Sequence, residues 1–131
     1  MRRLKWVTLP LILLGLTGCA SAATPPHPAP AVSRHEGGIT ITLRWLTVPT
    51  ELRAATFRLT VSPPPSRTQV SGTLTMTEMS MPPVPVTWHH LRLGQFDGQV
   101  VPTMAGPWRL TLVIRATHRI WREVYAVNVA N

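Results

Sequence analysis

Apolar and polar residues alternate along most of the chain after residue 38, and this alternation constrains the fold more than any other feature. Ile39, Ile41, Leu43 and Trp45 occupy every second position, which places them on one face of an extended strand. Three further segments, residues 56–61, 70–76 and 108–114, show the same alternation and are predicted to be strands. Shorter strands are predicted at residues 87–93, 95–101 and 120–129. Proline and glycine turn signals separate them, and no convincing helical period is present.

About seven short strands joined by turns predict an all-β protein, and specifically an immunoglobulin-like β-sandwich over residues 39–131. The chain has 131 residues, which leaves room for a single domain. Its one cysteine excludes an intrachain disulfide framework and any multi-cysteine zinc site. The domain is therefore expected to fold without a disulfide or a structural metal.

Residues 1–18 have the plan of a secretory signal. Arg2, Arg3 and Lys5 precede an apolar run that is too short to span a bilayer. The following Leu16-Thr17-Gly18-Cys19 resembles a bacterial lipoprotein box, in which the cysteine thiol is joined to diacylglycerol and becomes the new N-terminus. This resemblance implies lipidation of Cys19 and an extracytoplasmic protein that is anchored at the membrane surface through its lipid.

The segment 19–38 is predicted to be a disordered, proline-rich linker between the lipidated cysteine and the folded domain. It contains proline, alanine and serine but almost no large apolar residue, so it has nothing to bury. Truncation at Gly38 is accordingly expected to leave the thermal stability of the domain almost unchanged.

The formal net charge is +8, and removal of the signal leaves 10 arginines against 5 acidic residues. Such a charge could favour anionic lipid headgroups or acidic wall polymers, although a solvated sheet face is the simpler interpretation. Nucleic acid is not expected to be a partner, because the arginines are scattered and no aromatic platform accompanies them. No nucleophile elbow, zinc-protease motif or phosphate loop is present, so the protein is expected not to be an enzyme.

Residues 75–114 resemble the YtkA-like family of small exported bacterial domains, which are related in architecture to CopC-like copper proteins and FixH-type oxidase accessory proteins. The matching features are Met79-Ser80-Met81-Pro82, Gly94 with Phe96 in a strand, and Met104-Ala105-Gly106-Pro107-Trp108-Arg109-Leu110. The resemblance implies an immunoglobulin-like sandwich and an association with copper. The chain departs from the family pattern in its prolines at 82, 83 and 85 and in its His89-His90 pair.

The methionines and histidines of this region form a candidate copper site. Met79 and Met81 break the parity of Leu74 and Met76, so the strand over residues 70–76 must end or contain a bulge near residue 78. In an extended chain the Cα atoms of residues 79 and 81 lie on one side about 6.6 Å apart. Thioethers are soft ligands suited to Cu(I). One of His89 and His90 could complete the set, because adjacent strand residues face opposite ways, and Met104 is a further candidate.

Two functions remain open from the sequence. The first is an anchored extracytoplasmic domain that binds Cu(I) and presents it to an envelope oxidase or transporter. The alternative is a metal-free module of the cell envelope that docks another protein through a sandwich face or an edge strand. The two differ in whether the thioethers of Met79 and Met81 converge with an imidazole near an open surface.

Overall fold

The computed structural model describes residues 30–131, so the signal (1–18), Cys19 and residues 20–29 of the predicted linker lie outside it. The strands are β1 (Val32–Glu36), β2 (Ile39–Trp45), β3 (Ala55–Ser62), β4 (Gln69–Met76), β5 (Val84–Pro85), β6 (Thr87–Arg92), β7 (Gln95–Val100), β8 (Gly106–Ala116) and β9 (Arg119–Val129). The part of the chain that is described has no helix long and apolar enough to cross a membrane.

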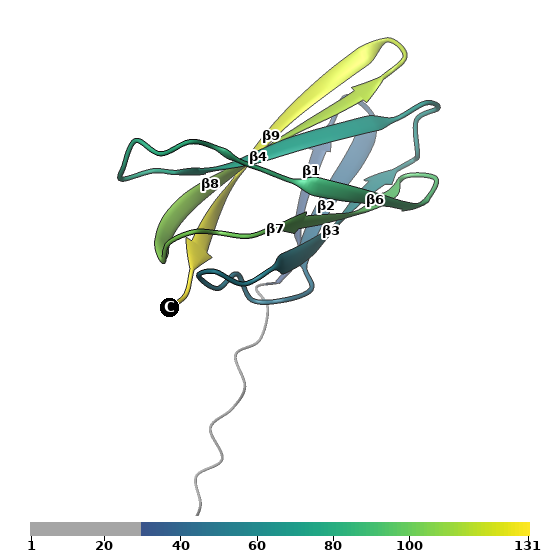
Figure 1. Ribbon diagram of the computed structural model, residues 1–131. Helices are drawn as coiled ribbons and strands as arrows, with labels where there is room; N and C mark the ends of the chain where they lie inside the picture. Colours follow the sequence, from purple (N-terminus) through teal and green to yellow (C-terminus); the bar gives the residue numbers. More distant parts are fainter. Residues whose placement is uncertain (1–29) are drawn as a thin grey trace, which may run out of the picture.

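Two antiparallel sheets pack face to face, one with strand order β1-β2-β3-β7-β6 and the other with order β5-β4-β8-β9 (Figure 1). The predicted all-β, immunoglobulin-like β-sandwich is confirmed, and all seven predicted strands are present. One end of the sandwich, here called the base, holds Pro30 and the C-terminus. The opposite end, here called the tip, holds the turns at residues 37–38, 63–68, 93–94 and 117–118.

The alternating residues form a single core between the two sheets, because each strand turns its apolar parity inward. In β2 the burial alternates at every residue, and in β9 the odd-numbered residues from Trp121 to Val129 are buried while the even-numbered ones are exposed. The largest side chains that are fully buried belong to Trp108, Phe57, Ile41, Leu59, Leu74, Leu110, Leu112 and Ile114.

Two glycines let an aromatic side chain enter the space between the sheets. Trp88 packs edge to face against Phe57, with ring centroids 5.4 Å apart. A Cβ at Gly98 would lie 2.3 Å from the Phe57 ring, and one at Gly72 would lie 3.3 Å from the Trp88 ring. The absence of a side chain at these positions therefore gives both rings their room.

The predicted boundary between linker and domain at residue 38 is wrong, because the folded domain includes β1. This strand pairs with β2 from Val32 opposite Leu43 to Glu36 opposite Ile39. The sequence pattern missed β1 because the positions that face the core's side carry the charged Arg34 and Glu36 beside a single apolar residue, Val32. Arg34 reaches Glu123 on the opposite sheet with an N–O distance of 2.7 Å.

The chain changes sheets between β5 and β6. The two residues of β5 pair with Thr73 and Leu74 of β4, and the N–H of Val86 then donates to the carbonyl oxygen of Gly72. From Thr87 onward the same extended segment pairs with β7 in the other sheet. β6 is consequently an edge strand of the five-stranded sheet.

Candidate functional site

The two methionines that were predicted to bind copper lie in the connection between β4 and β5, at the base. β4 ends at Met76, which settles the parity break as a strand end rather than a bulge. Met79 is 53% exposed, whereas Met81 is partly buried and packs against the core. The two thioethers therefore have different surroundings.

Met104 lies in the connection between β7 and β8, also at the base. Its side chain packs against the core, and its carbonyl oxygen accepts a hydrogen bond of 2.9 Å from the indole Nε1 of Trp108. Met104 therefore holds a buried tryptophan in position through its backbone.

His89 and His90 lie on β6 and face opposite sides of the sheet, as adjacent strand residues must. The His90 ring stacks on Phe96, with centroids 4.8 Å apart and an interplanar angle of 17°. His89 stands opposite Asp97, whose carboxylate accepts two hydrogen bonds from Arg58, at 2.8 and 3.0 Å. Asp97 also raises the pKa of Arg58, chiefly through these hydrogen bonds.

The structure separates the two predicted histidine ligands from Met79 and Met81. The chain runs extended from Val84 to His89, so the Cα atoms of these two residues lie roughly 16 Å apart. Met79 and Met81 precede this segment at the base, and β6 leads away from them toward the tip (Figure 1). Within residues 30–131, no group of three or more histidine, cysteine, aspartate or glutamate side chains could hold a metal ion.

The edges of the two sheets at β1 and β9 are joined by side chains. Arg34 of β1 donates to the carboxylate of Glu123 at 2.7 Å and to the carbonyl oxygen of Val124 at 2.8 Å. From β9, Arg119 donates to the carbonyl oxygen of Gly37. The guanidinium of Arg34 also lies 4.6 Å from the centre of the Tyr125 ring. Side chains of β1 and β9 thus bridge the edges of the two sheets, and we call this contact the β1–β9 seam.

Burial of Tyr125 in this seam raises its pKa to about 12, with the negative charge of Glu123 adding to the effect and Arg34 opposing it. Its hydroxyl group has no hydrogen-bond partner among the described residues. Tyr125 therefore contributes to the seam through its ring rather than through its hydroxyl group.

The backbone edge of β6 is open in the described part of the chain. Val61 of β3 donates its N–H to the carbonyl oxygen of Gly94, so alternation along the ladder turns Asp97 of β7 toward β6. Asp97 stands opposite His89, which must therefore bond to β7. It follows that the N–H and C=O groups of Trp88 and His90 point away from the sheet.

Exposed apolar side chains follow this open edge. Leu91, within β6, is 47% exposed, and Leu93, in the turn that follows β6, is 65% exposed. Leu91 is the extra residue of a β-bulge between His90 and Arg92. A hollow of about 410 Å³ lies beside the strand and is lined by Thr56, His89, His90, Leu91, Asp97, Gly98 and Gln99. We call the segment from Thr87 to Leu93, with this hollow, the β6 edge.

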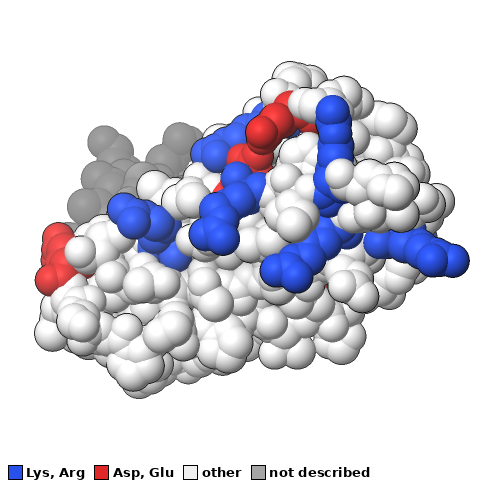
Figure 2. Space-filling view, turned by 90° about the horizontal axis from the view of Figure 1, so that it is seen from above, with Lys and Arg blue, Asp and Glu red and all other residues white. Residues whose placement is uncertain are grey.

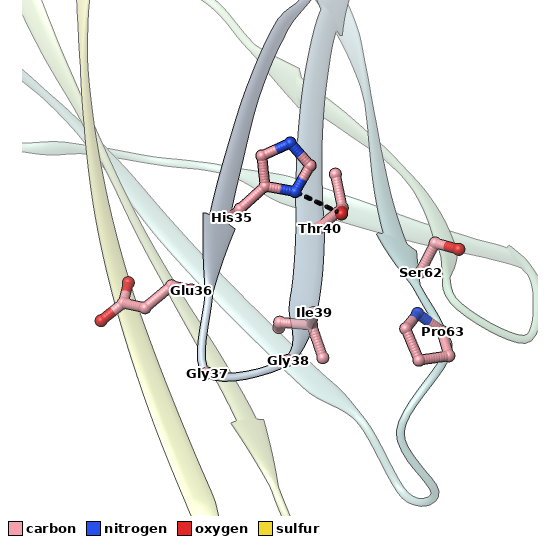
Figure 3. Close-up of a pocket in the computed structure, with 8 residues that line it drawn as sticks. All are labelled: His35, Glu36, Gly37, Gly38, Ile39, Thr40, Ser62 and Pro63. Atoms are coloured by element: carbon pink, nitrogen blue, oxygen red, sulfur yellow. Dashed lines mark hydrogen bonds between the residues drawn. The ribbon is translucent and has the colours of Figure 1, made fainter.

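A second hollow, of about 400 Å³, lies at the tip between the β1–β2 turn and the end of β3 (Figure 3). Nδ1 of His35 and Oγ1 of Thr40 are joined there by a hydrogen bond of 2.8 Å. Figure 3 shows the Glu36 side chain turned to the opposite side of its strand from His35. The imidazole of His35 is already hydrogen-bonded, and the carboxylate of Glu36 points away from the hollow. We therefore do not assign a catalytic role to this hollow.

Sequence reasoning did not single out Glu123, which is buried in the structure, with only 3% of its surface exposed. The signal was available, because Glu123 shares the inward parity of Trp121 and Tyr125 in a strand with strict alternation. A charge at such a position predicts a partner from another strand.

No family model matches the sequence, and no curated protein matches it. Among solved structures, the chain is similar to the crystal structure of the Lin-41 filamin domain, with a TM-score of 0.46, 11% identity, and coverage of 66% of this chain and 90% of that one. It is also similar to the crystal structure of the titin M3 domain, with a TM-score of 0.42, 14% identity, and coverage of 68% and 97%. These likenesses concern the fold alone.

Proposed function

We propose that the protein is a non-enzymatic, metal-free interaction module of the cell envelope, held at the membrane by lipid on Cys19, that receives an extended segment of a partner protein on its β6 edge. The observation that carries the proposal is the contrast between edges. Arginine side chains form hydrogen bonds between β1 and β9, whereas the backbone N–H and C=O groups of Trp88 and His90 point away from their sheet. An added strand would satisfy these groups by main-chain hydrogen bonds.

The side chains of the β6 edge support the same function. Main-chain hydrogen bonds supply affinity in strand addition, and pockets for alternate side chains supply specificity. Leu91 and Leu93 offer apolar contacts, and the neighbouring hollow of about 410 Å³ is large enough for a side chain of the incoming segment. The placement of Met79 and Met81 at the base, away from His89 and His90, favours this module over the copper-handling alternative.

Site-specific photo-crosslinking in intact cells tests the proposal. A photoreactive amino acid placed at Leu91 or Leu93 of the full chain should yield one discrete adduct with an envelope protein. The same group at Val32 or Leu52, which are 43% and 70% exposed, provides controls of comparable accessibility away from the β6 edge and should not yield that adduct.

A matched pair of variants identifies the backbone as the binding element. His90→Pro removes an outward N–H and should abolish the adduct, because proline is tolerated on an edge strand but cannot donate. His90→Ala keeps the N–H and should retain the adduct. Thermal unfolding of both variants verifies that they are folded. The proposal fails if His90→Pro, while folded, leaves the adduct unchanged, or if the control positions give the same adduct.

A further inference from the structure

The outer face of the sheet formed by β4, β8 and β9 carries positive charge without negative charge. Arg109, Arg115 and Arg122 are all exposed on this face. The only acidic residue on these strands is Glu123, which points inward. Figure 2 looks onto the top of the molecule as drawn in Figure 1 and shows positive side chains spread over this view, with negative ones beside them in the upper part and at the left end. We call the outer face of β4, β8 and β9 the basic face.

The three arginines are spread over an area rather than gathered at one point. Arg109 and Arg115 are six residues apart on β8, which corresponds to about 20 Å. Arg122 lies on β9 opposite Val113, between them. None of the three guanidinium groups forms an ion pair within residues 30–131. A ligand that engages all three must therefore be a surface or a long polymer rather than a small anion.

Two exposed apolar side chains share the basic face. Ile120 of β9 is 67% exposed and stands opposite Arg115, and Val124 is 39% exposed and stands opposite Thr111. The remaining positions on β4 are Gln69, Ser71, Thr73 and Thr75, which are uncharged. Arginines interspersed with aliphatic side chains suit a lipid headgroup layer, where the charge meets phosphate and the aliphatic group enters the acyl boundary.

The position of the chain termini allows this face to reach a membrane. The predicted lipidation site, Cys19, precedes the first described residue, Pro30, by 11 residues. A chain of this length spans at most about 40 Å, which is similar to the length of an 11-residue strand. The anchored domain can therefore lie on its side, with the basic face on the membrane.

We infer that the basic face docks on a membrane surface containing anionic phospholipid. In this orientation the opposite sheet, with Arg58 and Asp97 on its outer face, points away from the bilayer, and the β6 edge at its side stays accessible. This inference rests on the lipid anchor of the proposed function but not on docking at the β6 edge, because the basic face and the β6 edge share no residue.

Vesicle co-sedimentation tests the inference with the chain that starts at Ala20, which lacks Cys19 and so cannot be lipidated. The core lies within residues 39–129, so this chain retains every packed side chain. It should bind vesicles that contain about a third phosphatidylglycerol and should not bind vesicles of phosphatidylcholine alone. Each arginine near an anionic surface contributes about a fivefold factor, so the triple variant Arg109→Gln, Arg115→Gln, Arg122→Gln should bind about 100-fold more weakly.

A second triple variant with the same loss of charge supplies the control. Arg44, Arg53 and Arg67 are exposed on the other sheet and in loops, and their replacement by glutamine should weaken binding less than about fivefold. Equal loss in both triple variants would overturn the inference, because net charge alone would then explain binding. Equal binding to neutral vesicles would also overturn it, as would binding of a soluble polyanion without binding of anionic vesicles.

Discussion

At the scale of single residues, the ion pair between Arg34 and Glu123 is the most consequential polar contact. The Glu123 side chain is 4% exposed and the Arg34 side chain is 42% exposed. Replacement Arg34→Met should lower the free energy of unfolding by about 2 to 3 kcal/mol, because it leaves a buried carboxylate without its partner. Denaturant unfolding measures this loss. Adding Glu123→Leu should restore most of it, and a double variant that is less stable than Arg34→Met would contradict the account.

Tyr125 should make stability fall at alkaline pH. Its pKa of about 12 in the folded protein exceeds the ordinary value of 10.0. The folded state therefore holds its proton more tightly, so the associated stability is complete below pH 10 and is lost as the pH rises from about 10 to 12. Because Tyr125 is the only tyrosine, ultraviolet absorbance reports its ionisation directly.

The variant Tyr125→Phe should abolish this alkaline decline. At neutral pH it should leave stability unchanged or slightly raised, since the buried hydroxyl group that it removes has no partner in the described residues. Unfolding curves at several pH values compare the two proteins. A parent whose stability does not change between pH 10 and 12 would contradict the assigned environment of Tyr125.

At the scale of elements, β1 should be essential to the stability of the domain. A chain that begins at Ile39 loses the ladder with β2 and the Arg34 partner of Glu123. We expect a loss of at least about 3 kcal/mol relative to the chain that begins at Ala20. For a domain of this size that loss lowers Tm by more than about 10 °C. Thermal denaturation monitored by circular dichroism measures the Tm of both chains. Equal Tm values for the chains that begin at Ile39 and at Ala20 would restore the domain boundary at residue 38.

The same elements show how far the sequence predicts this fold. Alternation in β2, β3 and β8 identified strands whose inward side is apolar. β1 was not predicted because Arg34 holds it by a contact with Glu123, 89 positions away in the sequence, which a local pattern cannot reveal. β5 was not predicted because it has only two residues and lies among prolines. Local pattern thus predicts strands that bury apolar surface and misses those that are held by distant partners.

The candidate site was only partly predictable for a related reason. The opposite orientation of His89 and His90 follows from strand geometry and is confirmed. Their separation from Met79 and Met81 depends on the change of sheet after Pro85, which directs β6 toward the tip. Proximity in sequence suggested a cluster, whereas the extended segment from Val84 to His89 carries the histidines away from Met79 and Met81.

At the scale of the whole molecule, the arrangement predicts weak retention of copper. The parent chain and the double variant Met79→Leu, Met81→Leu should lose Cu(I) equally to a competing chelator, because these thioethers do not converge with His89 or His90. The leucine exchange should cost less than about 1.5 kcal/mol of stability. A parent that retains one equivalent of Cu(I) while the variant retains none would reinstate the copper-handling alternative.

The β6 edge and the basic face, proposed to bind a partner and a membrane respectively, are separate surfaces of the molecule, and the predicted lipidation site lies outside both. Of these, the open backbone of β6 is central, and amide hydrogen exchange at individual residues tests it most directly. In the free protein the amides of Trp88 and His90 should exchange rapidly, while that of His89, bonded to β7, should be protected. Addition of the crosslinked partner's extended segment should protect Trp88 and His90 and change His89 little. Protection of Trp88 and His90 already in the free protein, or a partner footprint on the tip or the basic face instead, would contradict docking at the β6 edge.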